Sequence, residues 1–405
     1  MTGPGPISVA HVITRLDIGG AQETAIRICA GLDRTRFAPV ILAGPDHGSG
    51  GSLRRDADDA GIEVRTVPAL HGPVRPWADI TAVRQLAAAF RDLRPGVVHT
   101  HSSKAGVVGR VAARRAHVPH VVHTVHGWSF NDTQPAPVAA AYRAIERVMA
   151  RRCDALVVVT PADRAIGLAS RIGRPDQYVT IRSGIPLDIP TMGTAERTAA
   201  RQELGWAAGD LVIISVGRLE AQKDPVGLIE ALAVARRRCP QLRLALVGAG
   251  SLDGDVRQCA HRLGIGDRVD LLGLRHDVPA LLGAADLFAL SSRWEGLPRA
   301  ALEAVRAGLP VVATDTGGIG EVITDGVTGR LVPIGDAAAL GGALADLAAD
   351  PQGARLLAAA AADRLPQFTE ARMVADTEAL YERLASGRDA VPPGQSGQPG
   401  ELAGP

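Results

Sequence analysis

Short apolar runs alternate with longer segments of helical period along most of the chain. The runs of the first half are 7–14, 38–44, 62–67, 96–102, 120–127, 155–160 and 177–184. Segments rich in Ala, Arg and Leu lie between them, such as 20–31, 79–93, 104–116 and 138–152. Strands that are apolar on both faces are typical of a parallel sheet covered by helices. The alternation therefore predicts a doubly wound α/β domain.

The same pattern occurs a second time after an interruption around Pro186 and Pro190. Its apolar runs are 211–217, 243–250, 268–273, 285–292, 310–315 and 329–335, followed by an amphipathic segment at 368–386. A chain of 405 residues is also too long for one hydrophobic core. We therefore predict the following parts: a Rossmann-like domain at 1–185, a linker at 186–200, a second such domain at 201–366, a terminal helix at 367–387 that returns towards the first domain, and a tail at 388–405 whose Pro and Gly content predicts disorder.

Charge and cysteine usage narrow the classes of protein. Lys plus Arg is 44 and Asp plus Glu is 43, and this balance argues against a nucleic-acid binder. No apolar run approaches the roughly 20 residues of a membrane span, and the first residues do not resemble a secretory signal. The cysteines (Cys29, Cys153, Cys239 and Cys259) lack metal-ligand spacing and are expected to be free buried thiols. We expect a cytoplasmic protein and leave peripheral membrane contact open.

Candidate chemistry is sought just after each strand, because open α/β sheets bind ligands at the carboxyl ends of their strands. Gly19 and Gly20 follow the first run and open a helix. Glycine allows close backbone approach to a ligand, and a helix N-terminus offers free N–H groups to an anion. A plain turn explains this pair equally well. The loop is not GxGxxG, so a dinucleotide site is not favoured.

Histidines gather in two neighbouring runs. His99, His101 and His123 lie within strands, whereas His126 stands at a strand end beside Gly127. Without an acid or cysteine at ligand spacing, a metal site is not predicted. Most single histidines are structural, and His126 is favoured as functional because of its position at the end of a strand.

Two cations follow the first strand of the second half, within "SVGRLEAQKDP". Arg218 and Lys223 are five residues apart across a turn. Arg binds two oxygens at once and Lys supplies a compact charge, which together suit a diphosphate. The alternative is a solvated basic turn.

Two carboxylates, Glu295 and Glu303, lie in "SSRWEGLPRAALEAVRAG". Glu295 is in a loop, and Pro298 and Gly308 delimit a helix that carries Glu303. Glu295 in the loop could accept hydrogen bonds from hydroxyl groups of one part of a ligand, and Glu303 on the helix from those of a second part. The helix N-terminus between the two acids would face a negatively charged group. This pattern indicates a nucleotide sugar, although Glu303 alone is equally typical of a solvated surface charge.

These stretches resemble the family-4 retaining glycosyltransferases, which have the GT-B fold. The strongest match is the E-x7-E pattern in "SSRWEGLPRAALEAVRAGLPVVATDTGG", with "VGRLEAQKD" and "LVGAGSL"; "GGAQ" and "HTVHG" match less specifically. "HSSKAGVVGRVAA" resembles members that build exopolysaccharide or other glycans. The resemblance implies two Rossmann-like domains facing across a cleft, and a hexosyltransferase that moves a sugar from a nucleoside diphosphate sugar to a hydroxyl of a glycan, lipid-linked or small-molecule acceptor.

The resemblance also implies a role for each matched residue. Gly19 and Gly20 would lie by the donor diphosphate, and His126 would contact the donor sugar. Arg218 and Lys223 would hold the diphosphate and neutralise charge on the leaving group.

The donor-binding loop completes this set. Glu295 would bind donor-sugar hydroxyls, in a loop that continues through Gly296 and Leu297. Glu303 would bind the ribose, and the loop near Arg275 would meet the base. The catalytic residues would then be His126, Arg218, Lys223 and Glu295.

Two positions depart from the family pattern. Ser183 stands in "RSGIP", where many members have an Asn-Gly turn, and Leu297 and Pro298 stand where many have Phe-Gly. Pro298 removes a backbone N–H that would otherwise be free to face a phosphate.

With both acids assigned to ligand hydroxyls, no nucleophile remains, so front-face attack assisted by the leaving diphosphate is favoured. No permanently bound cofactor is expected. A metal is not expected either, because Arg218 and Lys223 already serve the diphosphate. The DxD triplet at Asp56–Asp58 lies on a charged helix away from the strand ends.

Other activities remain open at this point. A nucleotide-sugar 2-epimerase, a phosphorylase with pyridoxal phosphate on a Lys, and a catalytically silent glycan-binding protein are the alternatives. Release of nucleoside diphosphate with and without an acceptor separates them. Several arginines make the first domain locally basic and suit an anionic lipid or a polyprenyl diphosphate, although a solvated helix face explains them equally: Arg114, Arg115, Arg143, Arg147, Arg151 and Arg152.

Overall fold

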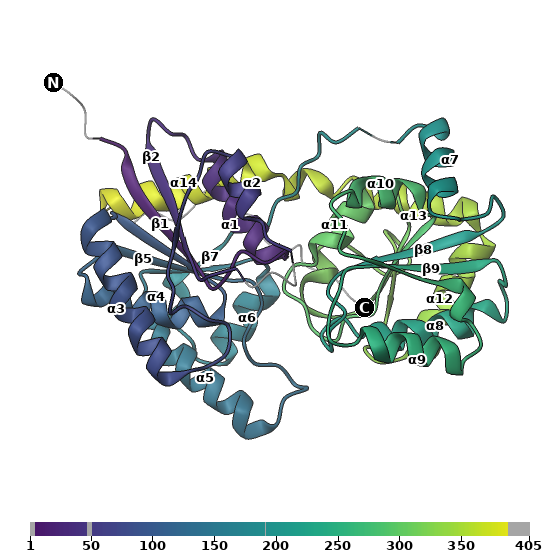
Figure 1. Ribbon diagram of the computed structural model, residues 1–405, viewed down its shortest axis with the longest axis horizontal. Coiled ribbons are helices and arrows are strands. Elements are labelled where there is room, and N and C mark those ends of the chain that lie inside the picture. The colour runs from purple at the N-terminus through teal and green to yellow at the C-terminus, as the bar shows by residue number, and fades with distance from the viewer. Residues whose placement is uncertain (1–4, 47–50, 191, 388–405) are drawn as a thin grey trace, which may run out of the picture.

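The chain forms two α/β lobes, each built on one parallel sheet (Figure 1). The computed structural model describes residues 5–46, 51–190 and 192–387. The first sheet has the order β3-β2-β1-β4-β5-β6-β7, and its strands are β1 (Ile7–Ile13), β2 (Phe37–Ala43), β3 (Glu63–Thr66), β4 (Val97–His101), β5 (His120–Val125), β6 (Ala155–Val158) and β7 (Tyr178–Thr180). The second has the order β10-β9-β8-β11-β12-β13, and its strands are β8 (Leu211–Val216), β9 (Leu242–Val247), β10 (Val269–Gly273), β11 (Leu287–Leu290), β12 (Val311–Thr314) and β13 (Arg330–Val332).

Helices connect successive strands and cover both sheets (Figure 1). Those of the first lobe are α1 (Gly20–Gly31), α2 (Arg54–Asp59), α3 (Pro76–Leu93), α4 (Ser103–Arg115), α5 (Ala136–Ala150) and α6 (Pro161–Ala169). Those that follow are α7 (Thr194–Glu203), α8 (Pro225–Arg236), α9 (Asp253–Arg262), α10 (Val278–Ala284), α11 (Arg299–Arg306), α12 (Ala337–Ala349), α13 (Pro351–Ala362) and α14 (Glu370–Ser386). Short 3-10 turns are η1 (Pro175–Gln177), η2 (Gly266–Arg268), η3 (Gly317–Glu321) and η4 (Leu365–Phe368).

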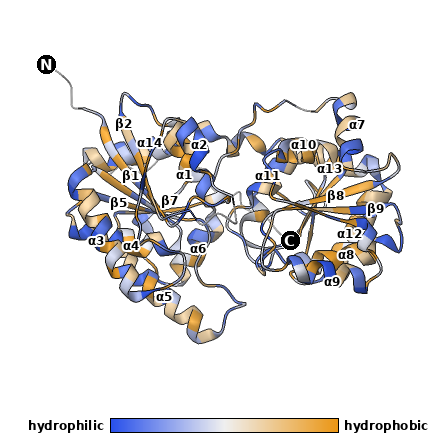
Figure 2. Ribbon diagram, viewed as in Figure 1, coloured by the Kyte–Doolittle hydropathy of each residue, from blue (hydrophilic) through white to orange (hydrophobic). Residues whose placement is uncertain are grey.

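The predicted fold of two parallel-sheet α/β domains is confirmed, and each predicted apolar run contains a strand. Most strands are drawn in the hydrophobic colour, whereas the helices around the sheets mix hydrophilic and hydrophobic positions (Figure 2). The run at 177–184 forms a strand over Tyr178–Thr180 alone. Directly after this run, Ile185 pairs with Thr369 in an isolated bridge outside the sheet.

The last helix, α14, crosses back to the first lobe, as predicted (Figure 1). Its apolar side chains Met373, Leu380 and Tyr381 pack in one cluster with Val9 and Phe37 of the first sheet. Tyr381 is fully buried there. This helix ties the two lobes together beyond the connection that follows β7.

The sequence-based domain limits remain predictions. Helix α7 begins at Thr194, within the segment predicted as the linker. The predicted disordered tail at 388–405 lies outside the described residues. Within the described ranges, no helix is long and apolar enough to span a membrane.

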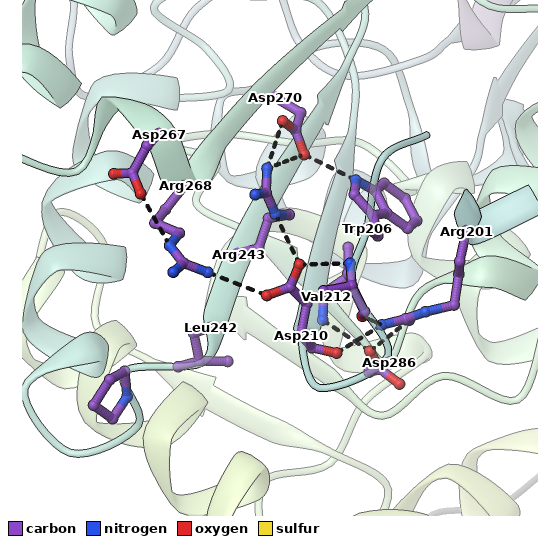
Figure 3. A network of polar contacts seen from close by, with 12 residues as sticks. Arg201, Trp206, Asp210, Val212, Leu242, Arg243, Asp267, Arg268, Asp270 and Asp286 are labelled. Carbon is purple, nitrogen blue, oxygen red and sulfur yellow. Dashed lines mark hydrogen bonds and ion pairs between the residues drawn. The ribbon is translucent and has the colours of Figure 1, made fainter. Parts of the chain in front are cut away.

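A charged network closes the amino ends of the second sheet (Figure 3). Arg243 lies between Asp270, with Nη1 2.8 Å from Oδ1, and Asp210, with Nε 3.3 Å from Oδ2. Arg201 Nη1 lies 3.0 Å from Oδ2 of Asp286. Since ligands bind at the opposite, carboxyl edge of such sheets, we interpret this network as structural.

Candidate functional site

The candidate site lies at the carboxyl edges of the two sheets. In the second sheet β8 stands between β9 and β11, and in the first sheet β1 stands between β2 and β4. Chain connections leave in opposite directions from these central strands, which is where open α/β sheets form a crevice for ligands. The loops after β8 and β11 carry the residues predicted to bind the donor.

Lys223 and Glu295 form the centre of the site. Lys223 Nζ lies 2.5 Å from Glu295 Oε1, and the Ser292 hydroxyl donates to the same oxygen at 2.6 Å. The Glu295 side chain is only 6% exposed, so burial strengthens its attraction to the ammonium group. Within the described part of the chain, Glu295 Oε2 has no hydrogen-bond partner and is available to a ligand hydroxyl.

The loops after β8 and β11 are joined by further hydrogen bonds. Gln222 Nε2 donates to the Trp294 carbonyl at 3.0 Å, and the Arg293 N–H donates to the Gln222 carbonyl at 2.8 Å. Arg218 is exposed and donates from Nη2 to Gln222 Oε1 at 3.3 Å. Gln222 therefore connects Arg218, one of the predicted cations, to the loop that carries Glu295.

A small pocket of about 10 Å³ lies beside these cations. Gly217, Arg218, Lys223 and Ser291 are among the residues that line it. A Cβ atom at Gly217 would lie 3.2 Å from Lys223 Cε, so glycine at this position lets the lysine lie across the strand end. The pocket has about the volume that a single water requires.

Backbone contact joins the Glu295 loop to the first lobe. A Cβ atom at Gly296 would lie 2.4 Å from the carbonyl oxygen of His126, a distance that no side chain tolerates. The Gly296 carbonyl in turn accepts a hydrogen bond from the Gly318 N–H at 2.7 Å. The predicted residues His126 and Gly296 are thus brought together across the junction of the lobes.

Arg299, the first residue of α11, forms a second contact between the lobes. Its Nη2 lies 2.9 Å from Glu23 Oε2 and its Nη1 donates to the Gly20 carbonyl at 3.4 Å. The same Nη2 lies 3.8 Å from Glu303 Oε1. The Arg299 side chain is only 8% exposed. This arginine therefore connects two of the predicted site residues, Gly20 of the first lobe and Glu303 of the second.

Glu303 lies beside this arginine, at the lobe junction. Burial raises the pKa of its carboxyl above the usual range; Arg299 opposes this rise, and the like charge of Glu23 adds to it. In the described residues its carboxylate accepts no hydrogen bond. Glu303 therefore remains able to accept hydrogen bonds from a diol.

The other predicted donor-loop residues are placed as follows. Leu297 is buried in the core of the second lobe, so only its backbone can serve a ligand. Pro298 precedes α11 rather than lying within its first turn. Gly308 has a φ of 77° and terminates α11 as predicted.

The remaining predicted residues stand at two other strand ends. Gly19 immediately precedes α1, and Gly20 is the first residue of that helix. Arg275 lies in the loop after β10, where its Nε is 2.7 Å from Asp277 Oδ1. This ion pair occupies the Arg275 side chain, so the contact with a base that the sequence predicts would fall to the backbone of the loop.

His126 is the predicted site histidine, at the end of β5 in the first lobe. Its Nε2 lies 3.1 Å from His101 Nδ1, and burial, aided by the charge of Arg299, lowers the pKa of His126 to about 4. Burial also lowers the pKa of His11 to about 3 and lowers those of His99 and His101 well below the ordinary value. These imidazoles are therefore neutral at physiological pH.

Because of these buried imidazoles, lowering the pH from 7.5 to 5.5 is expected to lower the melting temperature by several degrees. Their folded pKa values lie below the ordinary 6.5, so the unfolded chain binds more protons and stability falls as the pH drops below that value. Four carboxyl groups act in the opposite direction, because burial raises the pKa values of Asp163, to about 6, and of Glu303, Glu370 and Asp376. The histidines with lowered pKa values outnumber them, and their ordinary pKa of 6.5 lies inside this pH range. Thermal melts across this range check the expectation, and a melting temperature that stays constant or rises contradicts it.

The four cysteines are free and buried, as predicted from their scattered positions. Sequence reasoning missed Arg299, Gln222 and Ser292. Arg299 stands within the E-x7-E pattern, but its contact with Glu23 depends on how the lobes meet and has no local signal. Ser292 and Gln222 lie in loops that follow strands of the second sheet. Their location after these strands could have identified them as candidates.

Comparison with known proteins agrees with this geometry. The family model described as "Glycosyl transferase 4-like domain" matches residues 19–184, and "Glycosyl transferases group 1" matches 196–364. The chain is 30% identical to the UDP-Gal:alpha-D-GlcNAc-diphosphoundecaprenol alpha-1,3-galactosyltransferase of Escherichia coli, over 82% of this chain and 85% of that protein. It is also 30% identical to the "Putative glycosyltransferase EpsD" of Bacillus subtilis (strain 168), over 79% of this chain and 84% of that protein.

A solved structure resembles the whole two-lobed arrangement. HepE of Anabaena, in complex with UDP-glucose, superposes with a TM-score of 0.80 at 25% identity and covers 93% of this chain and 100% of its own. The predicted GT-B fold is thereby confirmed. The chain therefore belongs to the family-4 glycosyltransferases and is an enzyme that transfers a sugar from a nucleotide-sugar donor.

Proposed function

We propose that the enzyme uses a uridine diphosphate sugar and transfers its sugar, with retention at the anomeric carbon, to a hydroxyl of a glycan or lipid-linked acceptor. The observation that carries this proposal is the meeting of the two carboxyl edges. Lys223 and Glu295 of the second lobe stand beside the loop that contacts His126, and Arg299 reaches Gly20. UDP as the nucleotide is supported by the E. coli relative, named for UDP-Gal, and by the UDP-glucose complex of HepE.

In this proposal the diphosphate lies between two cations of the second lobe and the glycines of the first. Lys223 and Arg218 follow β8, and Gly19 and Gly20 open α1, whose free N–H groups suit an anion. Charge develops on the leaving diphosphate in the transition state. A fixed donor placed at such a charge is worth about 3 kcal/mol. Because both cations serve this charge, we propose that a metal ion is not required.

The two acids then bind the two ends of the donor. Glu295 Oε1 is occupied by Lys223 and Ser292, so Oε2 accepts a donor-sugar hydroxyl. Glu303 accepts the ribose hydroxyls, Gly296 and Leu297 contribute backbone, and the loop of Arg275 meets the base. His126 contacts the donor sugar from the first lobe.

The assignment of both acids to binding bears on how the proposed retention is achieved, because it leaves neither acid as a nucleophile. A retaining glycoside hydrolase uses one of its carboxylates as a nucleophile on the sugar. Here Glu295 is already paired with Lys223 at 2.5 Å, an arrangement that suits binding rather than attack. We therefore favour front-face attack by the acceptor, with the departing diphosphate taking up its proton.

A lipid-linked acceptor is supported by one face of the first lobe. Helix α5 exposes Val138, Ile145 and Val148, which are 42%, 43% and 46% exposed. Arg151, which follows this helix directly, is also exposed, and such a mixture of apolar and basic side chains suits an anionic membrane surface. The E. coli relative is named for an acceptor on diphosphoundecaprenol. We propose peripheral contact with the cytoplasmic face of the membrane.

Not all arginines predicted to serve this surface are free to do so. The Arg143 guanidinium stacks on the ring of Phe130, 4.8 Å from its centroid. Arg147 Nε donates to the Ser170 carbonyl at 2.8 Å. Arg114 lies 3.9 Å from Asp154. These arginines hold the first lobe together as well as making it basic.

A donor and acceptor screen tests the function. We expect one UDP-sugar to give UDP release that rises when a polyprenyl diphosphate-linked sugar is presented in anionic vesicles, with a matched water-soluble glycoside as the control. The anomeric configuration of the product, read by NMR, is expected to equal that of the donor. Absence of release with every nucleotide sugar contradicts the donor assignment, and an inverted product contradicts retention.

Replacing Glu303 with Gln is expected to weaken UDP binding by about tenfold, because a charged acceptor for the ribose diol becomes neutral. Calorimetric titration with UDP measures the dissociation constant. The control is Glu230→Gln on α8, which removes an acid that is 49% exposed and lies on another helix. Equal UDP affinity in wild type and Glu303→Gln excludes the ribose role.

A further inference from the structure

A continuous chain of hydrogen bonds, buried except for its partly buried last link, runs from the C-terminal helix to His126. This chain begins at Tyr381 on α14. Its hydroxyl lies 3.2 Å from His11 Nε2, and His11 Nδ1 lies 3.0 Å from His101 Nε2. His101 Nδ1 then lies 3.1 Å from His126 Nε2. The last ring nitrogen, His126 Nδ1, has no partner in the described part of the chain and is left for a ligand.

The chain extends beyond Tyr381 on its other side. The same hydroxyl lies 2.6 Å from His99 Nδ1, and His99 Nε2 lies 2.7 Å from Thr124 Oγ1. Tyr381, His99 and Thr124 are 0%, 1% and 3% exposed, so water does not compete for these bonds. Every ring nitrogen of His99 is thereby paired.

Strand register and the terminal helix create this arrangement. His11 of β1 is directly opposite His99 of β4, and His101 of β4 is directly opposite Thr124 of β5. In-register neighbours of a parallel sheet point to the same face. Helix α14 covers this face, which brings Tyr381 onto the row of imidazoles.

Hydrogen bonding accounts for this cluster better than a metal does. One nitrogen from each of His11, His99 and His101 lies within 4.8 Å of the others, which is compatible with metal ligation. However, both ring nitrogens of each of these residues already face a hydrogen-bonding partner. A neutral imidazole offers one donor and one acceptor, and the chain uses both on each ring.

Neutral rings in such a chain allow two proton arrangements. Each link holds one proton, so the direction of one link fixes the direction of all the others. In one arrangement His126 Nε2 accepts from His101 and Nδ1 is protonated. In the other, His126 Nε2 donates to His101 and Nδ1 carries a lone pair. The tautomer of a histidine is set by the bond that its other nitrogen makes.

The contacts of Tyr381 favour the second arrangement. Bonds donated by O–H are shorter than bonds donated by N–H. The hydroxyl is 2.6 Å from His99 Nδ1 and 3.2 Å from His11 Nε2, which fits donation to His99 and acceptance from His11. The 2.7 Å contact between His99 and Thr124 fits either direction.

We propose that Tyr381, His11 and His101 are positioning residues that hold His126 in the neutral tautomer with its proton on Nε2. His126 then presents Nδ1 as an acceptor for a hydroxyl of the donor sugar. This last contact rests on the proposed function, whereas the tautomer does not. The C-terminal helix thus sets the hydrogen-bonding character of a site residue that is three hydrogen bonds away.

The test is the ring nitrogen NMR spectrum of the full chain labelled with ¹⁵N-histidine at pH 7.5. We expect His126, assigned with His126→Gln, to be protonated on Nε2 alone. Tyr381→Phe removes only the hydroxyl and is expected to convert this signal to a mixture of tautomers. His101→Gln removes the direct partner of His126 and is expected to change the same signal. This second variant provides the test if Tyr381→Phe does not fold stably.

Kinetics separate positioning from a general structural effect. Tyr381→Phe is expected to lower kcat by about tenfold while leaving the UDP dissociation constant unchanged, because one neutral hydrogen bond to the sugar is weakened. The control is Thr377→Val, which removes another buried hydroxyl of α14 whose bond is to the Met373 carbonyl, and which is expected to retain the wild-type kcat and spectrum.

Three results overturn the proposal: protonation of His126 on Nδ1 in the wild type, a His126 signal that Tyr381→Phe and His101→Gln leave unchanged, or a stoichiometric metal ion in the purified protein that is lost in His11→Gln. The spectrum needs no turnover. If the spectrum is as expected but no sugar transfer is found, the proposed function fails and the tautomer assignment stands. If sugar transfer is found but the spectrum is not as expected, the tautomer assignment alone fails.

Discussion

Replacing Lys223 with Met is expected to lower kcat by ~10²–10³-fold, the cost of removing one preorganised donor from a developing charge. Methionine keeps most of the volume of the side chain and removes the ammonium that lies 2.5 Å from Glu295. UDP affinity is expected to fall less than kcat, because the charge on the diphosphate grows in the transition state. Initial rates of UDP release and calorimetric UDP titration measure the two quantities.

The same substitution isolates the part played by Glu295. In Lys223→Met the acid remains buried without its cation, so part of the loss arises from Glu295 itself. The double variant Lys223→Met with Glu295→Gln is therefore expected to lose less activity than the sum of the single losses. Arg257→Ala is the control, since it removes one exposed positive charge on α9. A kcat that Lys223→Met leaves unchanged contradicts the role of Lys223.

Replacing Arg299 with Met is expected to lower the free energy of unfolding by ~2 kcal/mol and to raise the donor KM. Removing one member of a buried ion pair costs about 3–5 kcal/mol, and the 31% exposure of Glu23 reduces this figure. The two carboxylates that remain, Glu23 and Glu303, then repel each other across the lobe junction. The contact of Arg299 with the Gly20 carbonyl is also lost, which loosens the loop that we propose binds the diphosphate.

A paired variant separates charge repulsion from loss of packing. The double variant Glu23→Gln with Arg299→Met removes the repulsion between Glu23 and Glu303. It is expected to regain part of the lost stability, whereas its donor KM is expected to stay nearly as high as in Arg299→Met. Urea unfolding and donor titration provide the measurements. If Arg299→Met is as stable as the wild type and has the same KM, Arg299 does not couple the lobes.

The fold was predictable because its signals are local. Runs that are apolar on both faces marked the buried parallel strands, and Pro298 and Gly308 marked the ends of α11 within two residues. The interruption near Pro186 marked the passage between the sheets. The early end of the strand in the run 177–184 was not predictable, since the next residue, Ile185, pairs with Thr369 far along the chain.

The site was predictable only in part. Strand ends and residue type identified Arg218, Lys223 and Glu295, and the structure brings the last two into direct contact. The position of Arg299 against Glu23 and of Tyr381 against His11 depends on contacts between distant segments. No spacing within either segment reports such contacts, because neither periodicity nor motif encodes the packing of α11 on α1 or of α14 on the first sheet.

The most direct test of the central claim is a crystal structure of the enzyme with UDP. The account predicts diphosphate oxygens within hydrogen-bond distance of Lys223 and Arg218, beside the start of α11, and ribose hydroxyls on Glu303. UDP bound at another surface, or bound in the cleft with these three side chains directed away from it, contradicts the account.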